Sequence, residues 1–378
     1  MKSTILPIIF VMAQALYRKY RPKKLEDVLG QETNIEILKN AAKSGRMGQA
    51  YIFHGPRGTG KTSTARLLAK LLNCEKRRTD PAFAKLGEPC NECRECIGID
   101  TQNSFDVIEI DAASNRGIDE IRNLKESIKT SPSSAAYKVY IIDEAHMLTG
   151  AAFNALLKTL EEPPRHAVIV LATTEYEKLP ATITSRAQRF TFKKLSKTTI
   201  IEKLSGIAKL EKIKIDEPAL ELVAAAAEGS FRDAESLLEQ MASLGIAIDL
   251  ATAERVTGRT GIKKVSEFAE LMLKKDVKSA LAYISLLNDE GYNLIQFTRD
   301  LIHYLRKMLS LKINPSLEKV FEKELTRDEI ASAKKLAAAA DAAFLVKLIK
   351  TLIRAYSEMR YSPFVIVPLE IAIVENLS

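Results

Sequence analysis

The segment Gly55–Thr62 reads Gly-Pro-Arg-Gly-Thr-Gly-Lys-Thr and fits the pattern G-x-x-x-x-G-K-[ST]. A short apolar run precedes it and an amphipathic run from Lys61 to Leu72 follows, so it is expected to join a strand to a helix. Backbone N–H groups in such a loop turn toward an anion, and the helix N-terminus adds partial positive charge. Lys61 would contact the terminal phosphates of a nucleotide, and the Thr62 hydroxyl would hold Mg²⁺. The predicted nucleotide-binding residues of the loop are Gly55, Pro56, Arg57, Gly58, Thr59, Gly60, Lys61, Thr62 and Ser63.

Two adjacent carboxylates, Asp143 and Glu144, follow an apolar run at Val139–Ile142. A carboxylate at the end of a buried strand is where phosphate-loop enzymes bind Mg²⁺, and Asp143 holds that position. Glu144 would orient or deprotonate the attacking water. The pair therefore predicts hydrolysis of a nucleoside triphosphate, with Lys61 as a third catalytic residue. Thr62 and Asp143 are the predicted Mg²⁺ ligands.

The same stretch, Asp143-Glu144-Ala145-His146, also spells the box of one class of RNA helicases. A helicase of that class needs further motor motifs in a second RecA-like domain. The C-terminal half of this chain predicts helices and no second parallel sheet. The sequence therefore favours an ATPase without a second motor domain, and a DEAH-type nucleic-acid helicase is kept as the alternative.

All four cysteines of the chain lie close together in the sequence, at Cys74, Cys90, Cys93 and Cys96. A secreted disulfide scaffold would be shorter and denser in cysteine. Four thiolates with CxxCxxC spacing suit a tetrahedral Zn²⁺, and Cys74 would close the site from the end of the helix that follows the phosphate loop. An iron–sulfur cluster uses similar spacing, but nothing else in the sequence suggests redox chemistry. We therefore expect a structural zinc module over residues of about 74–100.

Strand-like and helix-like segments alternate up to about residue 189, and they must position these groups. Apolar runs at Ala50–His54, Phe105–Ile110, Lys138–Ile142 and Ala167–Thr173 are the expected strands. Strands separated by helices predict an α/β fold with a parallel sheet covered on both faces. From Thr198 onward the apolar residues recur at helical spacing.

The chain has 378 residues, of which 56 are Lys or Arg and 48 are Asp or Glu, so its net charge is +8. This mild surplus permits a nucleic-acid partner without demonstrating one. No stretch approaches the ~20 apolar residues of a membrane helix. The chain is longer than one compact hydrophobic core usually accommodates, so two or three domains are expected. Together with the cysteine pattern, these features favour the cytoplasm and no membrane association.

The expected organisation has four parts. Residues 1–12 imitate a short signal peptide without a convincing cleavage site, so a disordered extension is favoured, and whether residues 1–11 are translated stays open. The predicted domains are a nucleotide-binding domain at 13–195, a small helical domain at 196–258 and an all-α domain at 259–378.

These motifs resemble those of the clamp-loader AAA+ ATPases, and most closely the gamma/tau family of bacterial DNA polymerase III. The resemblance covers nearly the whole chain from Ala13. Besides the phosphate loop and the cysteine insert, the matching segments are Tyr17–Pro22, Leu25–Gln31, Glu109–Ser114, Asn154–Pro164, Leu171–Thr174, Ser185-Arg186 and Gly229–Ala234. The resemblance implies an AAA+ sheet with an inserted zinc module, a lid and an all-α C-terminal collar.

The resemblance also implies roles for residues outside the phosphate loop. In that family the N-terminal box packs around the adenine, which gives the base-contacting positions Tyr17, Arg21, Pro22, Val28 and Leu29. Thr174 matches the sensor-1 residue, which responds to the γ-phosphate or its water. Arg186 matches an arginine that reaches the ATP of the adjacent subunit, and Arg232 matches the sensor-2 arginine of the lid. Ala187 replaces the family's cysteine, with no expected effect on the Arg186 guanidinium.

The implied partners are delta, delta-prime, further copies of this chain, the sliding clamp and primer–template DNA, within a nucleoid-associated replication complex. DNA would be bound without sequence preference through its phosphates, with Arg116 and Arg122 as the candidate contacts. The implied cofactors are ATP, Mg²⁺ and Zn²⁺. The alternative within the family is a mainly structural subunit of the delta-prime type, which the intact Lys61, Asp143 and Glu144 disfavour. The chain ends near the end of the family's third domain, so the tail of the longer tau form is not expected within it.

Overall fold

The structure is a computed structural model, and it describes residues 14–114, 124, 126–258, 261–321, 325 and 327–377. The chain divides into two compact units. The first unit extends to Leu195 and includes Ser230–Asp233, and the second consists of Ser196–Gly229 and the chain from Ala234 onward.

A five-stranded parallel sheet forms the centre of the first unit, in the order β2-β3-β4-β1-β5. Its strands are β1 (Ala50–His54), β2 (Val107–Asp111), β3 (Lys138–Asp143), β4 (Ala167–Thr173) and β5 (Gln188–Thr191). The expected parallel α/β sheet is therefore confirmed, and β5 is a strand that the sequence analysis missed.

The expected start of the second strand at Phe105 is wrong, because β2 begins two residues later. Phe105 is 82% exposed, and the buried carboxylate of Asp106 accepts hydrogen bonds from the backbone N–H groups of Ser133, Ser134 and Ala135. Asp106 thus ties the loop before β3 to this end of the sheet.

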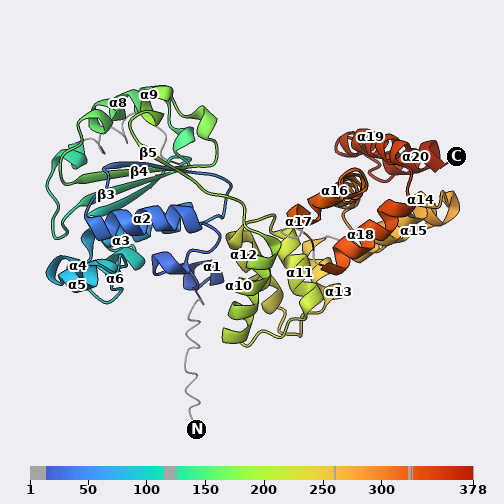
Figure 1. Cartoon of the computed structure of the whole chain (residues 1–378), viewed down its shortest axis with the longest axis horizontal. Helices are drawn as coiled ribbons and strands as arrows, with labels where there is room; N and C mark the ends of the chain where they lie inside the picture. Colours follow the sequence, from blue (N-terminus) through green and yellow to red (C-terminus); the bar gives the residue numbers. More distant parts are fainter. Residues whose placement is uncertain are drawn as a thin grey trace, which may run out of the picture. The chain divides into compact units, whose positions relative to one another are not determined.

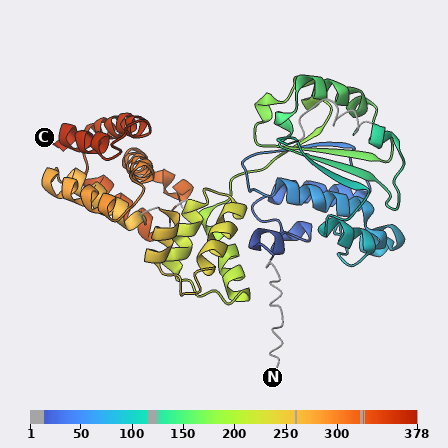
Figure 2. The ribbon, with the colours of Figure 1, turned by 180° about the vertical axis from the view of Figure 1, so that it is seen from behind.

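Helices cover both faces of the sheet, as Figures 1 and 2 show. Alternate strand residues face opposite sides. Tyr51 and Phe53 of β1 pack with helices α2 and α3, whereas Ile52 packs with helices α8 and α9. The helices of this unit are α1 (Leu16–Lys19), η1 (Leu25–Asp27), α2 (Glu32–Ser44), α3 (Lys61–Asn73), α4 (Glu75–Thr79), α5 (Pro81–Ala84), α6 (Arg94–Asp100), η2 (Ala145–Met147), α8 (Gly150–Glu161), η3 (Tyr176–Lys178) and α9 (Ala181–Thr184).

The described residues of the second unit form helices and loops, with one isolated parallel β-bridge between Ile215 and Ile248. Several of its helices begin at an Asp or Ser whose side chain accepts a backbone N–H of the first turn, for example Ser196, Asp216 and Asp341. The helices from residue 196 onward are α10 (Lys197–Leu210), α11 (Glu217–Ala226), α12 (Phe231–Ala242, whose first three residues belong to the first unit), α13 (Leu250–Thr257), α14 (Ile262–Leu273), α15 (Val277–Asp289), α16 (Leu294–Ile313), η4 (Pro315–Leu317), α17 (Glu318–Phe321), α18 (Arg327–Ala339), α19 (Ala342–Met359) and α20 (Val367–Leu377).

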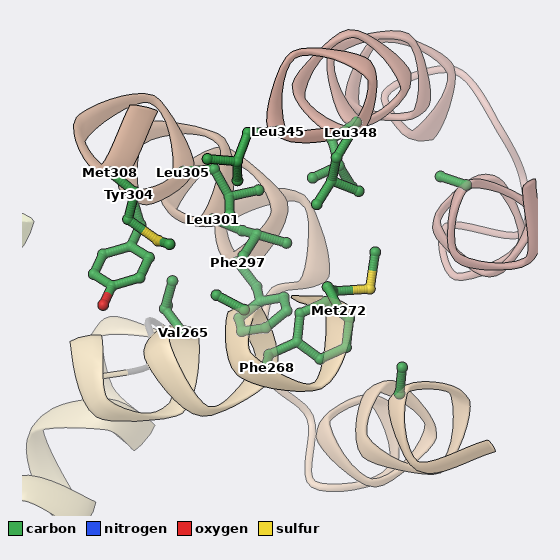
Figure 3. Close-up of a cluster of buried hydrophobic side chains, with 14 of the residues drawn as sticks. Val265, Phe268, Met272, Phe297, Leu301, Tyr304, Leu305, Met308, Leu345 and Leu348 are labelled. Atoms are coloured by element: carbon green, nitrogen blue, oxygen red, sulfur yellow. The ribbon is translucent and has the colours of Figure 1, made fainter. Parts of the chain in front are cut away.

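The C-terminal part of this unit has its own apolar core. In Figure 3, Phe297, Leu301 and Leu305 of α16 point between α14 and α19. Their four-residue spacing puts them on one face of the helix. No helix within the described residues is long and apolar enough to cross a membrane.

Candidate nucleotide site and cysteine cluster

The phosphate loop joins β1 to α3, as the sequence predicted. Three of its glycines have positive φ angles, of 144° at Gly55, 72° at Gly58 and 100° at Gly60. A Cβ at Gly55 would lie 2.1 Å from the Phe192 carbonyl oxygen, and one at Gly58 would lie 1.8 Å from Ser230 Oγ. Glycine is therefore required at both positions for steric as well as conformational reasons.

Lys61 begins α3 and is buried within this loop. Its Nζ donates hydrogen bonds to the carbonyl oxygens of Gly55 and Pro56, each at 2.8 Å. Burial lowers the pKa of Lys61, while Glu144 and Asp143 oppose that shift. The phosphate loop thus holds an ammonium group beside turned backbone N–H groups, an arrangement that suits a polyphosphate.

Thr62 and Asp143 meet at the end of β3, where the Thr62 hydroxyl donates to Asp143 Oδ2 at 2.7 Å. Hydroxyl and carboxylate oxygens are hard donors that suit Mg²⁺, which binds few protein ligands and keeps several waters. The two predicted Mg²⁺ ligands therefore lie side by side and fit the ion.

Glu144 adopts a left-handed backbone conformation, with φ of 47°. The Thr174 hydroxyl donates to Glu144 Oε2 at 3.0 Å, so the predicted sensor residue contacts the predicted base. His146 Nδ1 lies 2.9 Å from Thr173 Oγ1 and 3.5 Å from Glu144 Oε2, while His146 Nε2 lies 3.1 Å from Glu175 Oε1. In the sequence, His146 stands out only as part of a helicase box, and nothing in the sequence predicted its contacts with Thr173, Glu144 and Glu175.

The expected base-contacting segment lies against the phosphate loop. Val28 is buried, and its Cγ1 would lie 3.8 Å from a Cβ added at Gly60. The Arg232 guanidinium carbon lies 5.1 Å from the centre of the Tyr17 ring. Two residues from separate expected motifs are thereby brought together. Of the other expected positions, Leu29 is 38% exposed, and Arg21 and Pro22 are partly exposed.

Arg186 is not near the phosphate loop of its own chain. It lies just before β5, whose first residue pairs with Tyr51, whereas the loop begins after His54 at the other end of the parallel strands. Arg186 Nη2 lies 2.6 Å from Glu161 Oε1, and Nη1 donates to the Thr182 carbonyl oxygen at 2.7 Å.

The four cysteines form one cluster, and their Sγ atoms all lie within 4.8 Å of one another. A tetrahedral Zn²⁺ with bonds of about 2.3 Å requires sulfurs roughly 3.8 Å apart, so the residues fit the ion. Hydrogen bonds from the Cys96 thiol and the Cys90 N–H lower the pKa of Cys74 to about 4. The residues expected to contact DNA, Arg116 and Arg122, lie outside the described residues.

Three family models match successive parts of the chain. They are described as DNA polymerase III delta subunit (residues 30–196), DNA polymerase III clamp loader subunit ATPase lid domain (199–246) and DNA polymerase III subunits gamma and tau domain III (248–377). The chain is 36% identical to the DNA polymerase III subunit gamma of Buchnera aphidicola, over 80% of both chains. The chain belongs to the gamma/tau family of DNA polymerase III subunits.

Other members of the gamma/tau family are longer than this chain. The DNA polymerase III subunit tau of Bacillus subtilis is 43% identical over 96% of this chain and 63% of its own length. The gamma/tau subunit of Mycobacterium tuberculosis is 36% identical over 92% of this chain and 59% of its own length. Among solved structures, the Bacillus subtilis DNA clamp loader delta protein aligns over 90% of this chain with 14% identity and a TM-score of 0.40, so the assignment rests on the sequence relatives.

The DEAH-type helicase alternative is not supported. None of the matching family models describes a helicase. The part of the chain that the structure describes contains one parallel sheet, and its C-terminal half is helical.

Proposed function

We propose that this chain is the ATP-hydrolysing subunit of a sliding-clamp loader within the DNA polymerase III complex. The observation that carries the proposal is the set of contacts at the end of β3, where Thr62 meets Asp143 and Thr174 meets Glu144, next to Lys61 in the phosphate loop. A mainly structural subunit would not need these groups together. The family assignment supports the same function.

Each group has a defined task in phosphoryl transfer. Lys61 and the turned backbone N–H groups bind the β- and γ-phosphates. Thr62 and Asp143 would hold Mg²⁺, which would neutralise charge on the phosphates. Glu144 accepts a proton from the attacking water, and Thr174 orients the Glu144 carboxylate.

Arg186 serves the nucleotide site of a neighbouring subunit in this proposal. Its distance from its own phosphate loop, at the other end of the sheet, supports a role in trans. A guanidinium that arrives with the neighbour makes hydrolysis depend on assembly. Arg232, whose guanidinium carbon lies 5.1 Å from the centre of the Tyr17 ring, is proposed to respond to the bound nucleotide as the sensor-2 residue. We propose residues 196–258 as the lid and residues 259–378 as the collar.

The cysteine cluster is proposed to hold one structural Zn²⁺. The four thiolates would fill its tetrahedral coordination, which leaves no open position for catalysis. We expect the ion to hold the Cys90–Cys96 loop against the end of α3, where Cys74 lies.

The proposed partners are delta, delta-prime, further copies of this chain, the sliding clamp and primer–template DNA. DNA would be held through its phosphates, so binding would be independent of sequence and sensitive to salt. The proposed location is the bacterial cytoplasm, at the nucleoid.

A reconstituted clamp loader tests the proposal. The assay measures ATP hydrolysis stimulated by clamp and primed DNA, with Lys61→Ala and Arg186→Ala incorporated separately. Both variants should lose most of the stimulated activity, whereas the exposed-arginine control Arg165→Ala should keep it. Normal clamp loading by both Lys61→Ala and Arg186→Ala would contradict a motor function.

A further inference from the structure

Glu88 is a buried carboxylate in the loop that leads to the cysteine cluster, two residues before Cys90, and it is 7% exposed. Its Oε2 accepts the backbone N–H of Leu25 at 2.7 Å, and its Oε1 accepts that of Glu26 at 3.3 Å. Lys39 of α2 pairs with Oε1 at 2.8 Å, and this hydrogen bond raises the pKa of Lys39. Both carboxylate oxygens are therefore used to hold segments that come more than forty residues earlier in the chain.

The cysteine loop is itself fixed to the surrounding structure. Lys70 of α3 is 1% exposed, and its Nζ lies 2.5 Å from Asp100 Oδ1 and 3.0 Å from Asn91 Oδ1. The Arg77 guanidinium donates to four backbone carbonyl oxygens, those of Ala42, Leu71, Ala84 and Glu88. The loop that carries Glu88 is thus held by side chains of α3 and α4.

The segment from Leu25 to Gln31, which Glu88 holds at its start, contacts the phosphate loop at its other end. Leu25 begins the short helix η1 and is fully buried. Val28 reaches Gly60, and the Gln31 side chain donates to the carbonyl oxygens of Lys193, at 2.9 Å, and Thr59, at 3.5 Å. An unbroken set of contacts therefore runs from the cysteine loop to the phosphate loop.

The position of this segment indicates which part of a nucleotide it meets. Asp143 and Glu144 follow β3, on one side of the loop that leaves β1. The segment from Leu25 to Gln31 lies on the other side, where Gln31 bonds to Lys193 just after β5. A nucleotide whose terminal phosphates face Asp143 would direct its base toward β5 and this segment.

We propose that Glu88 is a positioning residue that holds the base-contacting segment in place and thereby couples the cysteine module to nucleotide affinity. The proposal rests on the proposed function, because it assumes that the phosphate loop binds ATP. Removal of the carboxylate leaves the N–H groups of Leu25 and Glu26 without their acceptor. The segment can then shift away from the base, while the phosphate contacts of Lys61 and Thr62 remain.

Calorimetric titration of the full chain with Mg²⁺-ATP and, separately, with Mg²⁺-tripolyphosphate tests this role. Glu88→Ala should weaken ATP binding about tenfold, which corresponds to about 1.4 kcal/mol. Tripolyphosphate has no base, so its affinity should change less than about twofold. Glu92→Ala, an exposed carboxylate of the same loop, is the matched control and should leave both affinities unchanged.

Glu88→Gln keeps the shape of the side chain and one acceptor oxygen, so it should bind ATP more tightly than Glu88→Ala does. If Glu88→Ala does not fold, the ATP and tripolyphosphate affinities of Glu88→Gln test the proposal in its place. Equal weakening of ATP and tripolyphosphate binding would overturn the proposal in favour of a general structural role. Unchanged ATP binding in both variants would overturn it as well. A wild-type chain that binds no ATP would instead refute the proposed function, so the two failures are distinguishable.

Discussion

Glu161 is expected to restrain Arg186, the arginine that we propose serves the neighbouring subunit. Arg186 lies 2.6 Å from Glu161 in its own chain, so this ion pair must open before the guanidinium can reach another nucleotide site. Glu161→Gln removes the charge but keeps the size of the side chain. We predict that this substitution accelerates ATP hydrolysis in the assembled clamp loader, because the released arginine becomes more populated.

The exposure of the pair limits the size of this effect. The side chains of Arg186 and Glu161 are 35% and 45% exposed, and exposed ion pairs contribute about 0.2–1 kcal/mol. Since about 1.4 kcal/mol corresponds to a tenfold rate change, the expected acceleration is roughly 1.4- to 5-fold. The acceleration should be largest at low ionic strength, since salt screens an exposed pair.

The assay is steady-state ATP hydrolysis by the reconstituted complex with clamp and primed DNA, measured at several salt concentrations. Glu162→Gln changes the adjacent exposed carboxylate and serves as the control. An unchanged rate with Glu161→Gln at low salt would refute the restraint, and so would a slower rate. An equal acceleration by Glu162→Gln would show that the effect comes from net charge alone.

Three further predictions concern catalysis, metal and pH. Thr174→Val should lower kcat at least tenfold with little change in ATP affinity, because a hydrogen bond to a charged group contributes about 1.5–3 kcal/mol; single-turnover hydrolysis and ATP titration measure the two. Metal analysis should find one zinc per chain, and Cys93→Ser should lower both the zinc content and the Tm. A wild-type chain without zinc, together with an unchanged Tm in Cys93→Ser, would contradict the metal site. For Asp106, burial raises the pKa, but three backbone N–H groups outweigh it and hold the pKa below its usual value, so its stabilisation is present above about pH 4 and is lost as the pH falls through the folded-state pKa. The unfolding free energy of Asp106→Asn should therefore depend less on pH in this range than that of the wild-type chain. An equal pH dependence in the two proteins would show that Asp106 is not the source of the effect.

The sequence was most informative where local chemistry requires particular residues. The phosphate loop was predicted from its glycines and Lys61, and the structure gives the steric reason at Gly55 and Gly58. Asp143 was predicted from its place after an apolar run, and β3 indeed ends there. The proximity of the cysteines followed from their spacing, which brings their four Sγ atoms together.

Contacts between distant segments could not be predicted in the same way. β5 is only four residues long, and one of them is buried, so it carries almost no periodic pattern. The sequence did not indicate that Glu88 is buried, because an acidic residue in a polar loop is ordinarily exposed. Its role as a hydrogen-bond acceptor depends on Leu25, which lies 63 residues earlier. The start of β2 was displaced by Asp106, whose hydrogen-bond partners lie 27–29 residues later in the chain.

We propose that ATP hydrolysis by this chain drives release of the clamp onto DNA. The most direct measurement records hydrolysis and clamp closure on primed DNA in one single-turnover experiment, with wild-type and Glu144→Gln complexes. The account predicts that the Glu144→Gln complex binds ATP and clamp as the wild-type complex does, but that hydrolysis and clamp closure both slow at least a hundredfold. Clamp closure at the wild-type rate without hydrolysis would contradict the account.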